Sequence, residues 1–264
     1  MRPVVYSASS VNAYTTCHLQ WYFGYVMAEP GIVSEPQMVG IWVHDWAEYK
    51  LRALRTEQGH PSMRTQCMIP MGETKQATDV FDRDILPTYR EPVLIESPFQ
   101  IEVDGIPFSG VIDSVDRQDI PGGEIVDWRA LPPDTVFTGI KSVMPGHANI
   151  LRDLKTTGKR PPAGKYWFNM VGYFLGARDL GFEIDIMQLD YIVRTQHPYY
   201  WPEVVPVPDM DDLTRWANVL QEVAGGVERA DYEPTGLGTY VCKFCPYRAI
   251  CGPYQRLKEV TSAT

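Results

Sequence analysis

The sequence predicts a mixed α/β protein in which a β-sheet is flanked by helices. Apolar residues recur at helical spacing near residues 7–27 and 39–54, and short β-rich runs separated by turn residues follow between residues 93 and 155. A helical segment and an apolar strand come next, over residues 165–193. Helices, a run of strands, a helix, a strand and a helix in this order favour a layered α/β architecture over a helical bundle or a β-sandwich.

Composition is typical of a globular protein. The chain has 264 residues, of which 44% are apolar and 22% charged, enough for a large core. Charges interrupt its apolar windows well before the roughly 18 residues of a membrane span, and residues 1–20 lack the apolar run of a secretory signal. We therefore expect a cytoplasmic protein without a membrane partner, built as one domain over residues 1–264.

The charge balance is acidic. The net charge of −9, from 33 acidic and 24 basic residues, argues at first against a nucleic-acid partner. Net charge describes the average field, however, and an acidic protein can carry a local basic groove. The balance therefore disfavours a broadly basic nucleic-acid clamp without excluding DNA.

Two helical segments are expected near the N-terminus. The spacing predicts one broken helix or two short helices over residues 7–27, whose first serines offer N-caps. A longer helix is predicted over residues 39–54, where His44 and Glu48 are four residues apart and share a face. Its expected apolar side consists of Ile41, Trp42, Trp46, Tyr49 and Ala53.

The centre of the chain is expected to be mainly β-structure. The predicted elements are a loop at 61–72, a helix at 76–89, and strands at 93–96, 99–103, 108–117, 124–128 and 150–155. Pro98 separates the first two strands, and Asp104-Gly105 signals a hairpin between the second and third. Residues 131–149 are rich in turn formers and predict an insertion or a mobile loop.

A strong helix is predicted after Pro161-Pro162. It covers residues 165–180 and is expected to end at Gly181. The apolar face of this helix is predicted to comprise Trp167, Met170, Val171, Phe174, Leu175 and Ala177. A strand at 184–193, a proline-rich stretch at 198–208 and a helix at 213–229 complete the expected order.

Four of the five cysteines form a split pattern. Cys242, Cys245 and Cys251 lie close together, and Cys17 near the other end is the natural fourth ligand of one metal centre. Cys67 has no partner in this pattern and is interpreted as incidental. The spacing leaves zinc, an iron-sulfur cluster and simple burial of small residues as alternatives, because both kinds of centre use four thiolates.

A second group combines acids with a lysine. Asp153 and Lys155 end an apolar run two residues apart, so they share one face of a strand, and Asp113 ends another expected strand. Two carboxylates can hold a divalent cation, while a lysine stabilises the developing negative charge. The pattern matches phosphodiester hydrolysis, although Asp-x-Lys by itself also occurs as a surface pair.

Taken in order, these features resemble the PD-(D/E)XK nuclease superfamily in its RecB-like branch. They are similar, more narrowly, to the iron-sulfur exonucleases typified by the Cas-four CRISPR-associated proteins and the AddB nuclease domain. The matching features are the opening serines before Cys17, His44, Gly110-x-x-Asp113, Asp153-Leu154-Lys155-Thr156, Asn169 with Tyr173, and the terminal cysteines. The resemblance covers nearly the whole chain.

The resemblance implies a restriction-endonuclease-like core and a set of roles. His44, Asp113, Asp153 and the backbone carbonyl of Leu154 would bind Mg²⁺ or Mn²⁺, and Lys155 would be the catalytic lysine. The domain would divide into N-terminal helices at 1–60, a catalytic core at 90–195 and a cluster-binding segment at 235–255.

The resemblance also implies a cofactor and partners. A 4Fe-4S cluster held by Cys17, Cys242, Cys245 and Cys251 would join the N-terminal and C-terminal segments. The substrate would be DNA, as single strands or ends, and the partners those of recombination or CRISPR adaptation.

Several residues are auxiliary candidates. The chain has Asn169 where the family usually has glutamine, and Asn169 and Tyr173 could contact DNA or the site. Asp127 is a rival or auxiliary to Asp153, and Glu96 could support the metal or face solvent. The basic residues Lys159 and Arg160 could meet phosphates or belong to a solvated loop.

Two further functions stay open at this point. One is a non-catalytic DNA-binding or recombination accessory protein of the same fold, suggested by Asn169 and the insertion at 131–149. The other is a zinc-stapled protein without a nucleic-acid role. Binding of DNA without metal-dependent cleavage would favour the accessory protein, and a colourless preparation that contains zinc would favour the zinc protein.

Overall fold

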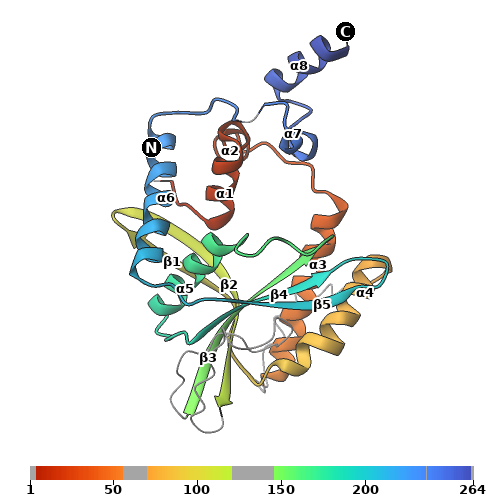
Figure 1. Cartoon of the computed structure of the whole chain (residues 1–264), viewed down its shortest axis with the longest axis vertical. Helices are drawn as coiled ribbons and strands as arrows, with labels where there is room; N and C mark the ends of the chain where they lie inside the picture. Colours follow the sequence, from red (N-terminus) through yellow and green to blue (C-terminus); the bar gives the residue numbers. More distant parts are fainter. Residues whose placement is uncertain (1–3, 56–69, 121–145, 236, 263–264) are drawn as a thin grey trace. The chain divides into compact units, whose positions relative to one another are not determined.

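The computed structural model describes residues 4–55, 70–120, 146–235 and 237–262, and the chain forms two compact units (Figure 1). We call them the terminal unit and the sheet unit. The terminal unit consists of Met1–Ser34, Glu102–Phe108 and Met210–Thr264, and the sheet unit of Glu35–Ile101 and Ser109–Asp209.

A five-stranded mixed sheet confirms the predicted α/β class. Its strands lie in the order β1-β2-β3-β4-β5. They are β1 (Glu91–Val103), β2 (Ile106–Ile120), β3 (Gly146–Thr157), β4 (Ile186–Val193) and β5 (Tyr199–Val205). β3 pairs antiparallel with β2 and parallel with β4, which pairs antiparallel with β5. The hairpin signal is also confirmed, because Asp104 and Gly105 join β1 to β2 with φ of 50° and 79°, as a type I′ turn requires.

Three expectations about the strands were wrong. Pro98 lies inside β1 rather than between two strands, which is tolerated because β1 is an edge strand. β3 begins at Gly146, so residues 146–149 of the expected insertion are strand. The proline-rich stretch contains β5, whose Pro202 is likewise at an edge of the sheet. The expected strand at 124–128 lies outside the described residues.

Helix α3 (Glu35–Leu54) begins four residues before its predicted start and, apart from the partly buried Trp46, buries a different face from the one expected. Ile41, Trp42 and Tyr49 are 49%, 36% and 49% exposed. The buried stripe is Val39, Val43, Ala47 and Leu51. Both stripes recur at helical spacing, so periodicity does not choose between them. The smaller side chains face inward because α3 packs closely, and a Cβ on Gly40 would lie 3.1 Å from Thr156 Oγ1 of β3.

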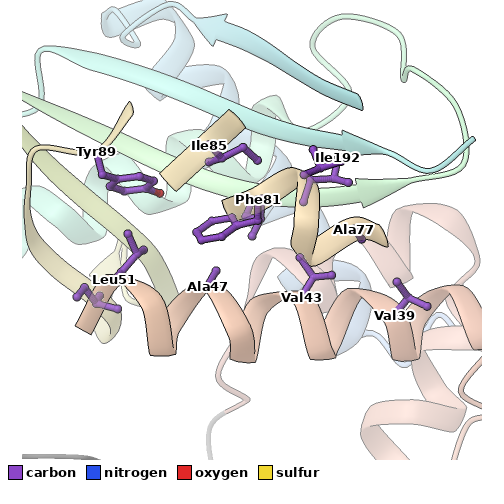
Figure 2. Close-up of a cluster of buried hydrophobic side chains, with 12 residues drawn as sticks. Val39, Val43, Ala47, Leu51, Ala77, Phe81, Ile85, Tyr89 and Ile192 are labelled. Atoms are coloured by element: carbon purple, nitrogen blue, oxygen red, sulfur yellow. The ribbon is translucent and has the colours of Figure 1, made fainter. Parts of the chain in front are cut away.

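The core beside α3 joins helix to sheet (Figure 2). Side chains of α4 (Gly72–Val80) and of the π-helical η2 (Phe81–Ile85) pack on the buried face of α3, and the 3₁₀ turn η3 (Leu86–Thr88) follows. The buried members are Val39, Val43, Ala47, Leu51, Ala77, Val80, Phe81, Ile85, Tyr89, Ile95, Leu154 and Ile192. The helix expected at 76–89 starts earlier, at Gly72. It continues as the π-helical η2 and ends in the 3₁₀ turn η3.

Helix α5 (Trp167–Asp179) connects β3 to its parallel neighbour β4. It ends as predicted at Gly181, whose φ is 88°. The N–H groups of Gly181 and Phe182 donate to the carbonyls of Arg178 and Ala177, which is a Schellman cap.

The terminal unit is helical apart from the β1–β2 turn. It contains α1 (Ala8–Thr16), α2 (His18–Trp21), the π-helical η1 (Tyr22–Val26), α6 (Met210–Glu228), α7 (Tyr240–Phe244) and α8 (Gly252–Ser262). The predicted break is confirmed, because Cys17 has extended backbone between α1 and α2. A capping box between Ser7 and Ser10 starts α1. Among the described helices, none has both the length and the apolar character needed to cross a membrane.

A buried charge network joins β3 to β4, β5 and η3. Arg152 is 2% exposed, and its Nε donates to Asp190 Oδ2 of β4 at 2.8 Å. The Arg152 guanidinium also lies 3.8 Å from the centre of the Tyr89 ring, and its Nη2 donates to Thr88 Oγ1. The other Asp190 oxygen accepts hydrogen bonds from Gln188 and Tyr200. A fully bonded network of this kind tolerates burial, whereas a broken one does not.

We expect Arg152→Met to destabilise the protein by about 3–5 kcal/mol, because it leaves the Asp190 carboxylate buried without its cation. Chemical denaturation followed by circular dichroism measures this change. The control is Arg117→Met on β2, where the arginine is 38% exposed. Equal stability of the two variants would contradict the expectation.

Candidate active site and cysteine cavity

Asp113 and Asp153 face each other across two neighbouring strands. The antiparallel ladder pairs Ser114 of β2 with Arg152 of β3, and the next step along it brings Asp113 opposite Asp153. Asp113 Oδ2 accepts a hydrogen bond from the backbone N–H of Leu154 at 2.8 Å. Opposing carboxylates repel, so the site depends on nearby cations and donors.

Lys155 is the nearest of these cations. Its Nζ donates to Asp153 Oδ1 at 2.6 Å and contacts the carbonyl of Leu154 at 3.4 Å. Asp153 is fully buried, and the same ammonium lies 2.6 Å from its Oδ2, to which no described donor is aligned. Burial raises the pKa of Asp153 to about 6, against the lowering effect of Lys155. The prediction that Asp153 and Lys155 share a strand face is thus consistent with their contact.

His44 of α3 and Glu96 of β1 lie beside Asp113. His44 Nδ1 lies 3.4 Å from Asp113 Oδ2 and 3.8 Å from Glu96 Oε1. Burial would lower the pKa of His44, but the nearby Asp113 and Glu96 carboxylates outweigh it and the pKa is raised. Glu96 has φ of 43°, a backbone conformation that is rare for residues other than glycine and that often marks functional sites.

Tyr173 and Asn169 approach the acids from α5. Burial raises the pKa of Tyr173, the Asp153 carboxylate raises it further, and the side chain of Asn169 hydrogen-bonds to it. Phe99 packs edge-on against Tyr173, with ring centres 6.4 Å apart. A Cβ on Gly110 would lie 2.8 Å from Phe99, and one on Gly176 would overlap it. The glycine in Gly110-x-x-Asp113 is therefore required by this packing.

The acids and the histidine form a set that suits a hard divalent cation. One ligand atom from each of His44, Glu96 and Asp113 lies within 4.8 Å of the other two. Oxygen and imidazole donors match Mg²⁺ or Mn²⁺. The buried Oδ2 of Asp153, to which no described donor is aligned, offers one more oxygen beside this group. The residues present therefore fit a divalent metal, with Glu96 as a more central member than expected.

The four expected cysteine ligands also come together, within the terminal unit. Cys17, Cys242, Cys245 and Cys251 are free thiols that line one cavity. Burial raises the pKa of Cys245, and the neighbouring thiols Cys17, Cys251 and Cys242 raise it further. Cys67 lies outside the described residues.

The four sulfur atoms are not arranged as closely as the ligands of a bound zinc ion. Four thiolates on one zinc ion, at Zn–S of about 2.3 Å, would lie roughly 3.8 Å apart. Among the described residues, no three of these sulfur atoms lie within 4.8 Å of one another. The four cysteines together are a donor set that suits a shared metal centre.

Comparison with known proteins identifies the family. The family model described as the PD-(D/E)XK nuclease superfamily matches residues 5–252. The chain belongs to this nuclease superfamily. The match includes the whole span from Cys17 to Cys251, with every residue of the site inside it.

The nuclease fold is also found by structural comparison. A crystal structure described as that of a candidate exonuclease from Eubacterium rectale matches with a TM-score of 0.52 and 12% identity. The alignment covers 87% of this chain and 83% of that one. At this identity the likeness concerns the fold. No curated protein matches the sequence significantly.

The two basic candidates, Lys159 and Arg160, have different surroundings. Lys159 lines a groove that begins at His44 and Lys155, whereas Arg160 stacks on Trp201. The sequence reasoning did not select Trp201, Tyr166 or Arg194, which lie in or beside this groove and belong to no motif. Asp127 lies outside the described residues.

We expect Glu96→Gln to weaken Mn²⁺ binding by at least about tenfold, because it removes one carboxylate from the group around His44. Calorimetric titration of the metal-free protein measures this change. Glu91→Gln is the matched control, since Glu91 is an exposed acid of the same strand. Equal affinity in both variants would exclude Glu96 as a ligand.

Proposed function

We propose that the protein is a divalent-metal-dependent DNA exonuclease that hydrolyses phosphodiester bonds of single strands or DNA ends. The observation that carries this proposal is the meeting of Asp113, Asp153 and Lys155 on the neighbouring strands β2 and β3, inside the strands rather than at the ends that the sequence suggested. Membership of the nuclease superfamily supports it. A RecB-like enzyme of the cytoplasm, acting in recombination or CRISPR adaptation, is the narrower assignment that the split cysteine pattern favours.

The metal ligands would be His44, Glu96, Asp113 and Asp153, with the carbonyl of Leu154. A bound Mg²⁺ or Mn²⁺ supplies Lewis-acid polarisation of a phosphoryl oxygen and a lower pKa for a bound water. The chain holds these groups before the metal arrives, because Leu154 N–H fixes Asp113 and the backbone at Glu96 directs that side chain toward His44.

Lys155 acts as a donor rather than a base. Burial would lower its pKa, but Asp153 and Asp113 outweigh that effect and the pKa is raised. The ammonium therefore stays protonated at neutral pH and can stabilise negative charge on the reacting phosphate. Tyr173, whose pKa is also raised, remains a neutral hydroxyl that can donate a hydrogen bond to the same region.

The four cysteines would hold a 4Fe-4S cluster. Their common cavity supports a shared metal centre, and the split cysteine pattern that resembles iron-sulfur nucleases favours this cofactor over zinc. Its role would be structural, because it would tie the segment after α1 to the segment around α7 within the terminal unit.

Replacement of Asp153 by asparagine tests the catalytic assignment. We expect Asp153→Asn and Lys155→Ala each to slow Mn²⁺-dependent release of nucleotides from a labelled oligonucleotide by about a hundredfold or more. The matched control is Asp79→Asn on α4, where Asp79 is exposed and pairs with Lys75. Wild-type activity in Asp153→Asn would disprove the assignment. Binding without cleavage by the wild type would favour the alternative of an accessory protein.

Anaerobic purification tests the cofactor. We expect a brown protein with about four iron atoms per chain, and loss of iron and visible absorbance in Cys242→Ser. Cys67→Ser is the matched control and should keep both. A colourless preparation with one zinc ion per chain would disprove the iron-sulfur assignment.

A further inference from the structure

A groove of about 960 Å³ in the sheet unit adjoins the candidate active site. His44 and Lys155 line it at the site, and Gly40, Ile41 and Asp45 of α3 line it further along. Its remaining wall comes largely from the loop at residues 158–166, which leads from β3 to α5. Any DNA strand held there would lie beside Lys155, whose ammonium contacts Asp153.

The groove is locally basic although the protein is acidic. Four cations line it, namely Lys155, Lys159, Lys165 and Arg194, against one carboxylate, Asp45. Lys155 is held by Asp153, and Arg194 pairs with Glu73 at 2.9 Å. Lys159 and Lys165 are exposed and form no ion pair with a described residue, so they are available to a polyanion.

Arg160 belongs to the same loop but has a different environment. Its guanidinium lies 3.4 Å from the centre of the Trp201 ring, and Trp201 belongs to β5. A guanidinium on an indole face is a favourable and planar contact. Arg160 does not line the groove as the two lysines do.

Two more contacts hold this loop on the sheet. The N–H of Gly164 donates to Glu203 Oε1 of β5 at 3.1 Å. The ring of Tyr166 lies 6.1 Å from that of Tyr191 on β4, and the ammonium groups of Lys155 and Lys165 lie 5.7 and 5.0 Å from its centre. The loop is thus attached at Arg160, Gly164 and Tyr166, with Lys159 and Lys165 between or beside these attachments.

We propose that the 158–166 loop is a preorganised phosphate-binding loop, in which Lys159 and Lys165 bind the backbone of a DNA strand and Arg160 acts as a positioning residue through Trp201. The inference rests on the proposed nuclease function, which supplies DNA as the polyanion. Preorganisation matters because an attached loop loses less conformational entropy on binding than a free one.

Binding of a fluorescent single-stranded oligonucleotide, measured by anisotropy in EDTA, tests the lysines without cleavage. We expect Lys159→Ala and Lys165→Ala each to weaken binding and to reduce the slope of log affinity against log salt by about 0.7. The control is Arg83→Ala, which removes an exposed cation of η2 from outside the groove lining. Wild-type affinity in the double lysine variant would overturn the proposal.

The role of Arg160 needs variants that separate charge from stacking. We expect Arg160→Lys and Trp201→Leu each to weaken binding about three- to tenfold, because each breaks the stacking contact. Neither removes a charge, so the salt slope should stay at the wild-type value. The double variant should bind no more weakly than the single ones, since both act on one contact.

Other results would assign Arg160 differently. Wild-type affinity in Arg160→Lys, together with a smaller salt slope in Arg160→Ala, would make Arg160 a direct phosphate contact. Arg160 is exposed, so its variants should fold. They test the role of Arg160 even if a thermal melt shows that Trp201→Leu is unfolded. A protein that binds through the lysines but does not cleave disproves the nuclease proposal alone, and an active nuclease indifferent to these changes disproves the loop alone.

Discussion

Two carboxylates facing each other across adjacent strands are the constraint on which the site depends. Asp113 and Asp153 lie one step beyond the last pair of the β2–β3 ladder, where like charges would normally destabilise a sheet. The protein offsets this repulsion with the Lys155 ammonium and the Leu154 N–H. Burial leaves a residual cost, seen in the raised pKa of Asp153. A divalent cation is the ligand that such a site favours most.

Alternate residues of β3 point to opposite faces of the sheet, so one face carries packed residues and the other carries residues of the candidate active site. Leu154 lies in the apolar core with residues of α3 and α4, and Arg152 forms a buried ion pair with Asp190 and contacts Thr88 of η3. Asp153 and Lys155 face the opposite side, toward Tyr173 of α5. The site is therefore rigid because its neighbours in sequence are fully packed. Substitutions on one face should affect folding, and those on the other should affect catalysis.

The acidic net charge is consistent with a DNA substrate once the charges are located. Carboxylates gather where a cation would bind, and that cation inverts the local field. The adjoining groove contains four basic side chains, two of which pair with acids of the protein itself. Binding through so few phosphate contacts should be weak, with a shallow dependence of affinity on salt, because each contact adds only about 0.7 to the slope.

The sequence by itself determined the features that depend on local geometry. Alternation along a strand predicts that Asp153 and Lys155 share a face, two turn residues predict the hairpin at Asp104, and the order of motifs predicts the nuclease superfamily. Only the tertiary structure decided which stripe of α3 is buried, because periodicity allows both. It also placed Glu96 beside His44, with a positive φ at Glu96 that no sequence pattern predicts. It likewise placed Arg160 on the ring of Trp201, forty-one residues further along the chain. Contacts between distant segments depend on packing, which local spacing does not determine.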